Sequence, residues 1–212
     1  MNVDFWNQKW KKNEIGFHES KPNPLLVSHF GKLKLAEGSR IFLPLCGKTL
    51  DITWLLSKGY RVAGAELSKL AIEQLFIALG VEPVVTKLAN AAHYSTENID
   101  IFVGDIFELS SEIVGMVDAV YDRAALVALP EEMRKKYTKH LLDITGTAKQ
   151  ILITFEYDQS QIDGPPFSIS SDEVNRHYKG AYSLECIESQ SVPGGLKGAC
   201  AATEHVWLLK NN

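Results

Sequence analysis

A glycine turn between two short apolar runs, with an acid at the end of the second run, constrains the fold of this chain most. Arg40 to Leu43 is typical of a buried strand, Pro44 to Gly47 forms the turn, and Glu66 follows nineteen residues after Gly47. In open α/β sheets a nucleoside ligand binds here, because glycine lets the backbone approach it and the acid accepts hydrogen bonds from ribose hydroxyls. The spacing predicts a nucleoside site.

Two other interpretations of this pattern stay open. A buried strand followed by glycine also occurs in α/β proteins that bind no nucleotide, and one glycine is a weaker signal than G-x-G-x-x-G. An NAD(P)-dependent oxidoreductase also suits an acid after the second strand, although it needs a glycine-rich diphosphate loop and the turn offers only Gly47. A nucleoside-binding module without catalysis is the third alternative, so the rest of the chain has to distinguish the three.

Length and charge narrow the class of protein. With 212 residues, 45% of them hydrophobic, the chain can bury one substantial core, which predicts a single domain over 1–212 with lead-in helices over 1–30. A net charge of −4 with scattered Lys and Arg argues against a nucleic-acid partner. The sequence has no apolar run long enough to cross a membrane and no signal-type apolar region near Met1, so we expect a cytoplasmic protein.

Cysteine and histidine usage predicts neither a disulfide framework nor a metal site. The three cysteines lack C-x-x-C spacing, and the six histidines form no H-x-x-x-H pair. Cys46 lies in the glycine turn without a neighbour that would activate a thiolate, so we interpret it as a small packed residue.

Strand and helix patterns alternate along the rest of the chain. Apolar runs predict strands at 40–43, 61–65, 100–105, 117–121 and 150–155. Helical spacing with caps and stops predicts helices at 4–12, 25–30, 50–58, 69–79, after Pro130, and 172–178. The polar segment 90–98 carries no element in this scheme, and two β-rich runs at 183–191 and 202–209 flank Gly194-Gly195. This order resembles the Rossmann-like α/β fold of class I S-adenosylmethionine-dependent methyltransferases, a mostly parallel sheet ending in an antiparallel hairpin.

Several side chains follow the predicted strands, where right-handed crossovers bring the strand ends to one edge. Glu66 can accept hydrogen bonds from an adenosyl ribose or be a solvated acid at a strand end. Asp105 and Ile106 are placed to meet an adenine, with Phe107 either stacked on the base or part of the core. Arg123 lies in an apolar stretch and needs an anion, which can be a cofactor carboxylate, an anionic substrate, Asp122 or another structural acid.

An aromatic helix precedes the α/β repeat. Trp6 and Trp10 are spaced i, i+4 and share one helix face, and Phe17 follows just after Gly16. Such a stripe is either a permanently packed face or a lid that keeps water from the reaction centre. We expect a lid, because the helix lies outside the repeat.

A set of motifs spread over nearly the whole chain resembles the thiopurine S-methyltransferase family. They are Trp6-x-x-x-Trp10, Gly16-Phe17-His18, Pro44-Leu45-Cys46-Gly47-Lys48, Asp51, Gly64-Ala65-Glu66-Leu67-Ser68, Asp122-Arg123-x-Ala125-Leu126-Val127-Ala128 and Gly164-Pro165-Pro166-Phe167. The short N-terminus is similar to that of the bacterial members.

The resemblance implies a cytosolic, monomeric enzyme that moves a methyl group from S-adenosylmethionine to the thiol of a small aromatic or heterocyclic molecule. Bacterial relatives are also associated with methylating selenium and tellurium species. The resemblance places four residues at the cofactor: Trp10, Leu45, Glu66 and Arg123. It also places Asp105 and Ile106 at the adenine and Phe17 towards the acceptor, with Arg123 a possible stabiliser of the acceptor.

The departures from the family pattern fall in the acceptor region. The loop from Val192 to Ala201 has no arginine where some relatives carry one, and Lys197 is its only cation. Thr203 stands where an aromatic residue is common. The departures therefore affect the prediction of acceptor preference more than the prediction of the cofactor.

Overall fold

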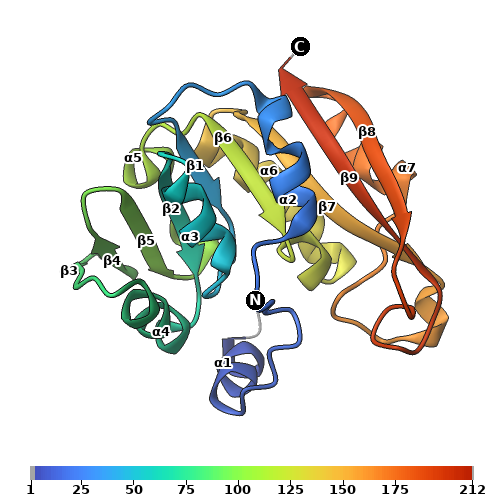
Figure 1. The fold of residues 1–212 in the computed structure, drawn as a ribbon, viewed down its shortest axis with the longest axis horizontal. Coiled ribbons are helices and arrows are strands. Elements are labelled where there is room, and N and C mark those ends of the chain that lie inside the picture. Colours follow the sequence, from blue (N-terminus) through green and yellow to red (C-terminus); the bar gives the residue numbers. More distant parts are fainter. Residues whose placement is uncertain (1–2, 212) are drawn as a thin grey trace.

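The five predicted strands form the parallel centre of a nine-stranded sheet. In the computed structural model, which describes residues 3–211, the strand order is β3-β4-β5-β2-β1-β6-β7-β9-β8 (Figure 1). The parallel strands are β1 (Arg40–Leu43), β2 (Arg61–Glu66), β5 (Ile99–Gly104), β6 (Ala119–Arg123) and β7 (Lys149–Tyr157). Their alternation with helices brings their carboxyl ends to one edge of the sheet.

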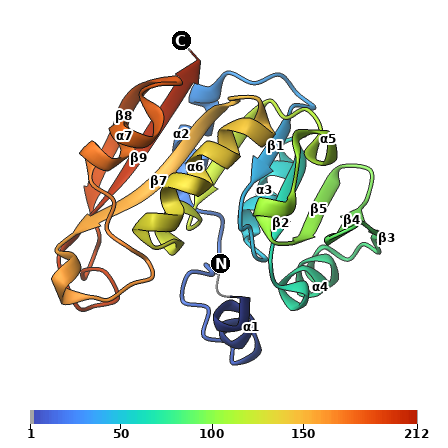
Figure 2. The same cartoon turned by 180° about the vertical axis from the view of Figure 1, so that it is seen from behind.

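Helices cover both faces of the sheet. One face packs against α2 (Pro24–His29), α3 (Leu50–Ser57) and α4 (Lys69–Leu79), and the other packs against α5 (Ser111–Val114), α6 (Glu131–Thr145) and α7 (Ser171–Tyr178), as Figure 2 shows from behind. Local chemistry sets their ends. For example, Ser68 Oγ accepts a hydrogen bond from Ala71 N at the start of α4, and Gly80 ends that helix with a left-handed φ of 68°. The buried strands are apolar on both faces because helices cover both.

The chain closes with the antiparallel hairpin that the glycine pair predicts. Strand β9 (Ala202–Asn211) pairs antiparallel with both β7 and β8 (Tyr182–Ser191), with an irregularity between Cys186 and Glu188. This topology confirms the predicted fold class. Among the described residues, no helix is long and apolar enough to cross a membrane.

Two details differ from the sequence prediction. The polar segment 90–98 contains β4 (Ala91–Ser95), which pairs with β5 and with β3 (Val84–Lys87). These strands form the exposed edge of the sheet, with Tyr94 the only buried side chain among their residues, so their sequence lacks the apolar alternation that predicts a strand. The fourth parallel strand spans Ala119–Arg123 rather than 117–121, so it begins and ends two residues later than predicted.

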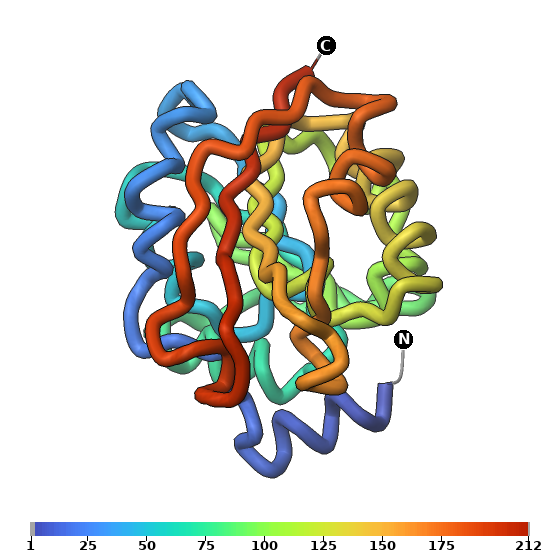
Figure 3. Tube along the Cα trace, turned by 90° about the vertical axis from the view of Figure 1, so that its right-hand side faces the viewer, coloured from blue at the N-terminus to red at the C-terminus, as the bar shows by residue number. Residues whose placement is uncertain are grey.

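The predicted N-terminal helix is present as α1 (Val3–Lys11). It lies beyond the carboxyl ends of the parallel strands, outside the layers formed by the other helices, as Figure 1 and the side view in Figure 3 show. A connecting segment returns from α1 to α2, where Asn23 Oδ1 accepts hydrogen bonds from Leu25 N and Leu26 N. The chain therefore crosses the edge formed by the carboxyl ends of the parallel strands before it enters the α/β repeat.

Candidate functional site

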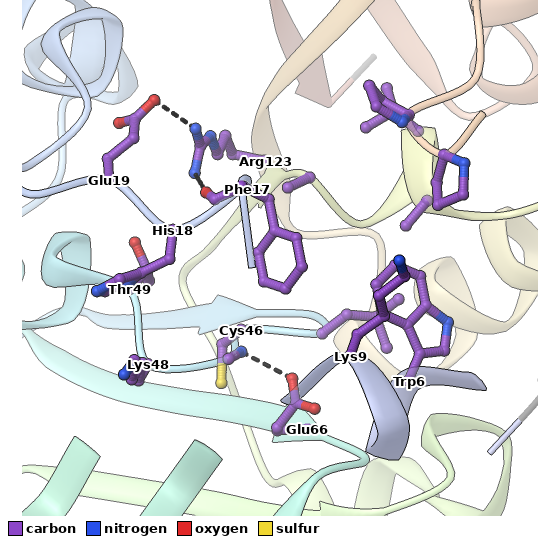
Figure 4. Close-up of a pocket in the computed structure, with 18 of the residues that line it drawn as sticks. Trp6, Lys9, Phe17, His18, Glu19, Cys46, Lys48, Thr49, Glu66 and Arg123 are labelled. Atoms are coloured by element: carbon purple, nitrogen blue, oxygen red, sulfur yellow. Dashed lines mark hydrogen bonds and ion pairs between the residues drawn. The ribbon is translucent and has the colours of Figure 1, made fainter. Parts of the chain in front are cut away.

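A cavity of about 550 Å³ lies at the carboxyl ends of β1, β2 and β6, and the N-terminal segment forms part of its wall (Figure 4). Its lining comes from residues 5–19, the turn after β1, the end of β2, the end of β6 with the residues that follow, and the loops around 165 and 197. This volume lies within the range typical of small-molecule and cofactor pockets.

The glycine turn and Glu66 meet at this cavity. Glu66 is 5% exposed, and its Oε2 accepts a hydrogen bond from Gly47 N at 2.7 Å while Oε1 accepts one from Ser68 N at 2.8 Å. Burial raises the pKa of the Glu66 carboxyl, and the backbone hydrogen bonds from Ser68 and Gly47 oppose that rise. Each carboxylate oxygen has capacity for a further donor, so ribose hydroxyls fit this carboxylate.

The backbone beside Glu66 is held in an unusual conformation. Leu45 and Gly47 have left-handed φ values of 47° and 53°, and Cys46 N donates to Ala65 O at 2.9 Å. Ala124, after Arg123, has a φ of 63°. Left-handed backbone at residues other than glycine is uncommon and clusters at ligand sites. Both non-glycine positions line the cavity.

Cys46 is a packed residue of the turn. It is 8% exposed, and a Cβ at Gly64 would lie 3.0 Å from its Sγ. Burial raises the pKa of the Cys46 thiol well above its usual value, so the thiol stays protonated and is unsuited to nucleophilic chemistry.

The aromatic side chains of the N-terminal segment pack against the glycine turn. Trp10 is 5% exposed, and a Cβ at Gly47 would lie only 2.9 Å from Trp10 Cζ2. The Phe17 ring centroid lies 5.5 Å from that of Trp10 and 6.0 Å from that of Trp6. Lys48 Nζ lies 5.9 Å from the Trp10 ring centroid. The predicted Trp10 and Phe17 therefore line the same cavity as Glu66, while gating by this segment stays a prediction.

Arg123 has an acid as a partner, but that acid is not Asp122. Arg123 Nη2 donates to Glu19 Oε1, and Nη1 donates to Phe17 O at 2.8 Å. Asp122 accepts from Tyr137 Oη at 2.6 Å instead, because successive side chains of a strand point to opposite faces. Of the partners left open by the sequence, the structure supplies another structural acid. A cofactor carboxylate or an anionic substrate at Arg123 stays a prediction.

A buried network that the sequence reasoning missed supports this arrangement. Asp51 is 1% exposed, its Oδ1 accepts from Asn23 N at 2.7 Å, and its Oδ2 accepts from Tyr121 Oη at 3.1 Å. Asn23 Nδ2 in turn donates to Glu19 Oε2 at 3.4 Å. Asp51 is one of the residues through which the sequence resembles the family. Its position in the first turn of the helix after the glycine turn was the sequence feature that could have indicated this network.

Asp105 and Ile106 lie at the expected sheet edge but do not line the cavity. They follow β5, in which Val103 is paired with Glu66 of β2. Asp105 Oδ1 accepts from Phe107 N at 3.1 Å, and Ile106 is fully buried with its carbonyl 2.8 Å from His140 Nε2. Their contact with an adenine stays a prediction.

Apolar side chains from the C-terminal part of the chain also line the cavity. Phe155, Pro165, Pro166 and Leu196 line it, and Lys197 Nζ donates to Pro165 O at 2.6 Å. Within residues 3–211, no group of three or more His, Cys, Asp and Glu side chains is arranged to hold a metal ion. The cavity thus combines a carboxylate suited to hydroxyl donors with an apolar region suited to a planar molecule.

Comparison with known proteins identifies similar chains over the full length. The sequence model of the thiopurine S-methyltransferase family matches residues 1–212. A thiopurine S-methyltransferase of Xanthobacter autotrophicus is 54% identical over 211 residues, covering 99% of both chains. One of Teredinibacter turnerae is 53% identical over 212 residues, covering 100% of this chain and 99% of the relative.

Solved structures with low sequence identity share the fold. A SAM-dependent methyltransferase from Anabaena variabilis superposes with a TM-score of 0.67 at 16% identity, covering 99% of this chain and 95% of that chain. The 1,6-didemethyltoxoflavin-N1-methyltransferase of Burkholderia thailandensis, solved with 1,6-didemethyltoxoflavin and S-adenosylhomocysteine, gives a TM-score of 0.67 at 14% identity, covering 99% of this chain and 87% of that chain. These similarities confirm the fold alone.

Proposed function

Because this chain belongs to the thiopurine S-methyltransferase family, we propose that it methylates the sulfur of a small aromatic or heterocyclic thiol. The coarser statement is established: the protein is an S-adenosylmethionine-dependent methyltransferase. The observation that carries the finer proposal is one cavity lined both by the Glu66 carboxylate and by apolar side chains such as Phe155, Pro165 and Pro166.

We assign the cofactor to the part of the cavity around the glycine turn. Glu66 is suited to the ribose hydroxyls, and the Leu45 backbone and the Trp10 ring are suited to the adjoining part of the molecule. Arg123 is suited either to the cofactor carboxylate or to an anionic acceptor, the two roles that the sequence leaves open. Asp105 and Ile106 stay assigned to the adenine, which on this proposal extends beyond the described cavity towards β5. Bound S-adenosylmethionine supplies a methyl group activated by its positively charged sulfur.

The residues of this chain contribute positioning and the exclusion of water. A thiol ionises readily, so its methylation requires little help from a base, and orientation of the acceptor dominates the rate. Phe17 and Phe155 with Pro165 present flat faces to a planar acceptor. Arg123 stays protonated and so acts through its charge rather than as a base.

The proposal also covers the range of acceptors, the oligomeric state and the location of the protein. The bacterial members that this sequence resembles are associated with selenium and tellurium species, and we include these soft nucleophiles among the acceptors. We also propose that the protein acts as a monomer in the cytoplasm. The NAD(P)-dependent oxidoreductase considered from the sequence is not retained, because the family and its relatives are methyltransferases.

The direct test measures methyl transfer by the purified protein. We expect S-adenosylmethionine and benzenethiol to yield methyl phenyl sulfide and S-adenosylhomocysteine, both detected by mass spectrometry. Phenol and aniline should yield no methylated product. Calorimetric titration should show binding of S-adenosylhomocysteine and none of NAD. Binding of S-adenosylhomocysteine without turnover on any thiol would favour the non-catalytic module, and methylation of phenol or aniline alone would contradict the thiol assignment.

A further inference from the structure

Two ion pairs line the cavity within the described residues, and their burial differs. Lys9 and Glu14 pair with side chains that are 36% and 51% exposed. Arg123 and Glu19 pair with side chains that are 13% and 39% exposed. A pair between exposed charges contributes little because water screens it, whereas removing one partner of a buried pair leaves a charge that needs another counterion. Arg123 is the less exposed of the two cations, so the loss of its counterion should have the larger effect.

The pair lies beside Phe17, which the proposed function assigns to the acceptor. Figure 4 shows Arg123 and Glu19 on one side of the Phe17 ring and Glu66 on the other. Ala124, Val127 and Ala128, which follow Arg123, line the cavity together with it. The Arg123 guanidinium thus lies among these apolar residues, with Glu19 as the anion in contact with it. Lys197 lies on the wall formed by Pro165, where its Nζ donates to Pro165 O.

We propose that Glu19 is a specificity-determining residue that neutralises Arg123 and thereby favours thiols with an uncharged ring over thiols that carry a carboxylate. This inference rests on the proposed function. An acceptor carboxylate that approaches Arg123 Nη2 must either displace Glu19 or lie beside its negative charge. A neutral planar thiol can bind without competing with Glu19 for Arg123.

Other charged and titratable groups near Arg123 do not replace Glu19. Glu204 on β9 is partly buried, and burial raises its pKa while the charge of Arg123 lowers it. The Glu204 carboxylate accepts from Gln190 Nε2 at 3.2 Å. Burial lowers the pKa of His18, as do the charges of Lys48 and Arg123, which favours the neutral imidazole. Glu19 also accepts a hydrogen bond from Asn23 Nδ2 at 3.4 Å, so each of its carboxylate oxygens has a partner.

The test compares two acceptors that share a ring and differ in charge. Methylation of 4-mercaptobenzoate and of 4-methylbenzenethiol is measured for the unaltered protein and for Glu19→Gln, which keeps a hydrogen-bonding side chain and removes the charge. We expect Glu19→Gln to lower KM for 4-mercaptobenzoate roughly tenfold relative to KM for 4-methylbenzenethiol, because Arg123 then lacks its counterion. Weaker packing of the N-terminal segment should change kcat for both thiols equally, so the ratio of the two KM values is the quantity that tests the inference.

Three matched variants control this result. Glu14→Gln removes an equal charge from the same segment and should leave the ratio of the two KM values unchanged. Glu19→Asp retains the negative charge. It should therefore retain the preference of the unaltered protein for the neutral thiol over the thiol that carries a carboxylate. An equal change for both acceptors in Glu19→Gln, an unchanged ratio, or the same shift in Glu14→Gln or Glu204→Gln would overturn the inference.

Failure of the proposed function gives a different result. If the unaltered protein methylates neither thiol, the thiol assignment is wrong, and Glu19 is then tested by binding alone. Calorimetric titration of each thiol into the complex with S-adenosylhomocysteine should still show tighter binding of 4-mercaptobenzoate to Glu19→Gln than to the unaltered protein. An equal dissociation constant for the two proteins would reject the role of Glu19.

Discussion

At the scale of single residues, the buried carboxylates of this protein have different partners and different consequences. Glu66 accepts hydrogen bonds from the backbone and lines the cavity. Asp122 is completely buried, accepts from Tyr137 Oη and Leu126 N, and does not line the cavity. Replacing Glu66 should therefore alter ligand binding, and replacing Asp122 should alter stability.

Glu66→Ala should weaken binding of S-adenosylhomocysteine by about 1.5–3 kcal/mol, the range for a hydrogen bond to a charged group. Calorimetric titration measures this loss, and circular dichroism checks that the variant is folded. Glu73→Ala on the exposed face of α4, where Glu73 pairs with Lys69, is the matched control and should bind as the unaltered protein does. A folded Glu66→Ala variant with an unchanged dissociation constant would remove Glu66 from the site.

Asp122 should make stability fall as pH rises. Burial raises the pKa of the Asp122 carboxyl from 3.8 to about 6. The folded protein thus binds this proton more tightly than the unfolded chain, and the stabilisation present below pH 3.8 is lost as pH rises through about 6. Between these limits the loss amounts to about 3 kcal/mol.

Urea unfolding of the unaltered protein and of Asp122→Asn at a series of pH values measures this effect. Relative to Asp122→Asn, the unaltered protein should lose about 3 kcal/mol of unfolding free energy between about pH 3.5 and about pH 7. Asparagine cannot ionise, so the comparison isolates this one group. Parallel stability curves for the two proteins would show that Asp122 keeps an ordinary pKa.

At the scale of elements, α1 and the segment after it depend on few contacts. Trp10 rests on Gly47, and Arg123 holds the segment through Phe17 O and Glu19. Other residues of α1 are exposed or half-buried, because the helix lies outside the layers that cover the sheet (Figure 3). An element with so few buried side chains is expected to open at a low free-energy cost.

Amide exchange in residues 4–18 should therefore be fast in the free protein and slow when S-adenosylhomocysteine and a thiol are bound. Hydrogen exchange followed by mass spectrometry measures both states, and β1, which is central in the sheet, provides an internal reference that should be slow in each. Equal protection of residues 4–18 in the two states would show a permanently packed face. Trp10 would then still line the cavity, but the segment would not act as a lid.

At the scale of the whole molecule, a single sheet connects two hydrophobic clusters. Phe42 and Ile41 of β1 belong to opposite clusters, as do Leu152 and Ile151 of β7, because alternate side chains of each strand enter opposite faces. Both clusters include side chains of the same strands, so disruption of these strands would expose apolar side chains of both clusters. The two faces should therefore unfold together, as expected of one domain.

We expect a single thermal unfolding transition and a monomer of 23.6 kDa by light scattering. The near-ultraviolet signal of the tryptophans and the far-ultraviolet signal of the backbone should change at the same temperature. Saturating S-adenosylhomocysteine should raise that temperature, because a ligand that binds only the folded state stabilises it. Two separate transitions, or a dimer at micromolar concentration, would contradict these expectations.

The sequence by itself determined the features that depend on local pattern. Apolar runs, caps and glycine stops predicted the five parallel strands, most helices and the final hairpin, because these signals act within one element. The turn at Gly47 and Glu66 was predictable for the same reason, since both stand at fixed distances from neighbouring strands. The exposed hairpin of β3 and β4 was missed because its stability comes from pairing at the sheet edge rather than from apolar alternation.

Only the tertiary structure decided which distant groups meet. Arg123 pairs with Glu19, 104 positions away, and Asp51 contacts Tyr121, 70 positions away, through the packing of the N-terminal segment on the strand ends. Sequence spacing carries no record of such contacts, because they depend on how several elements pack together. The same packing leaves Asp105 and Ile106 outside the cavity although their sheet edge was predicted correctly. Local pattern thus located the sheet edge at which the cavity lies, whereas long-range packing determined which charged groups pair there.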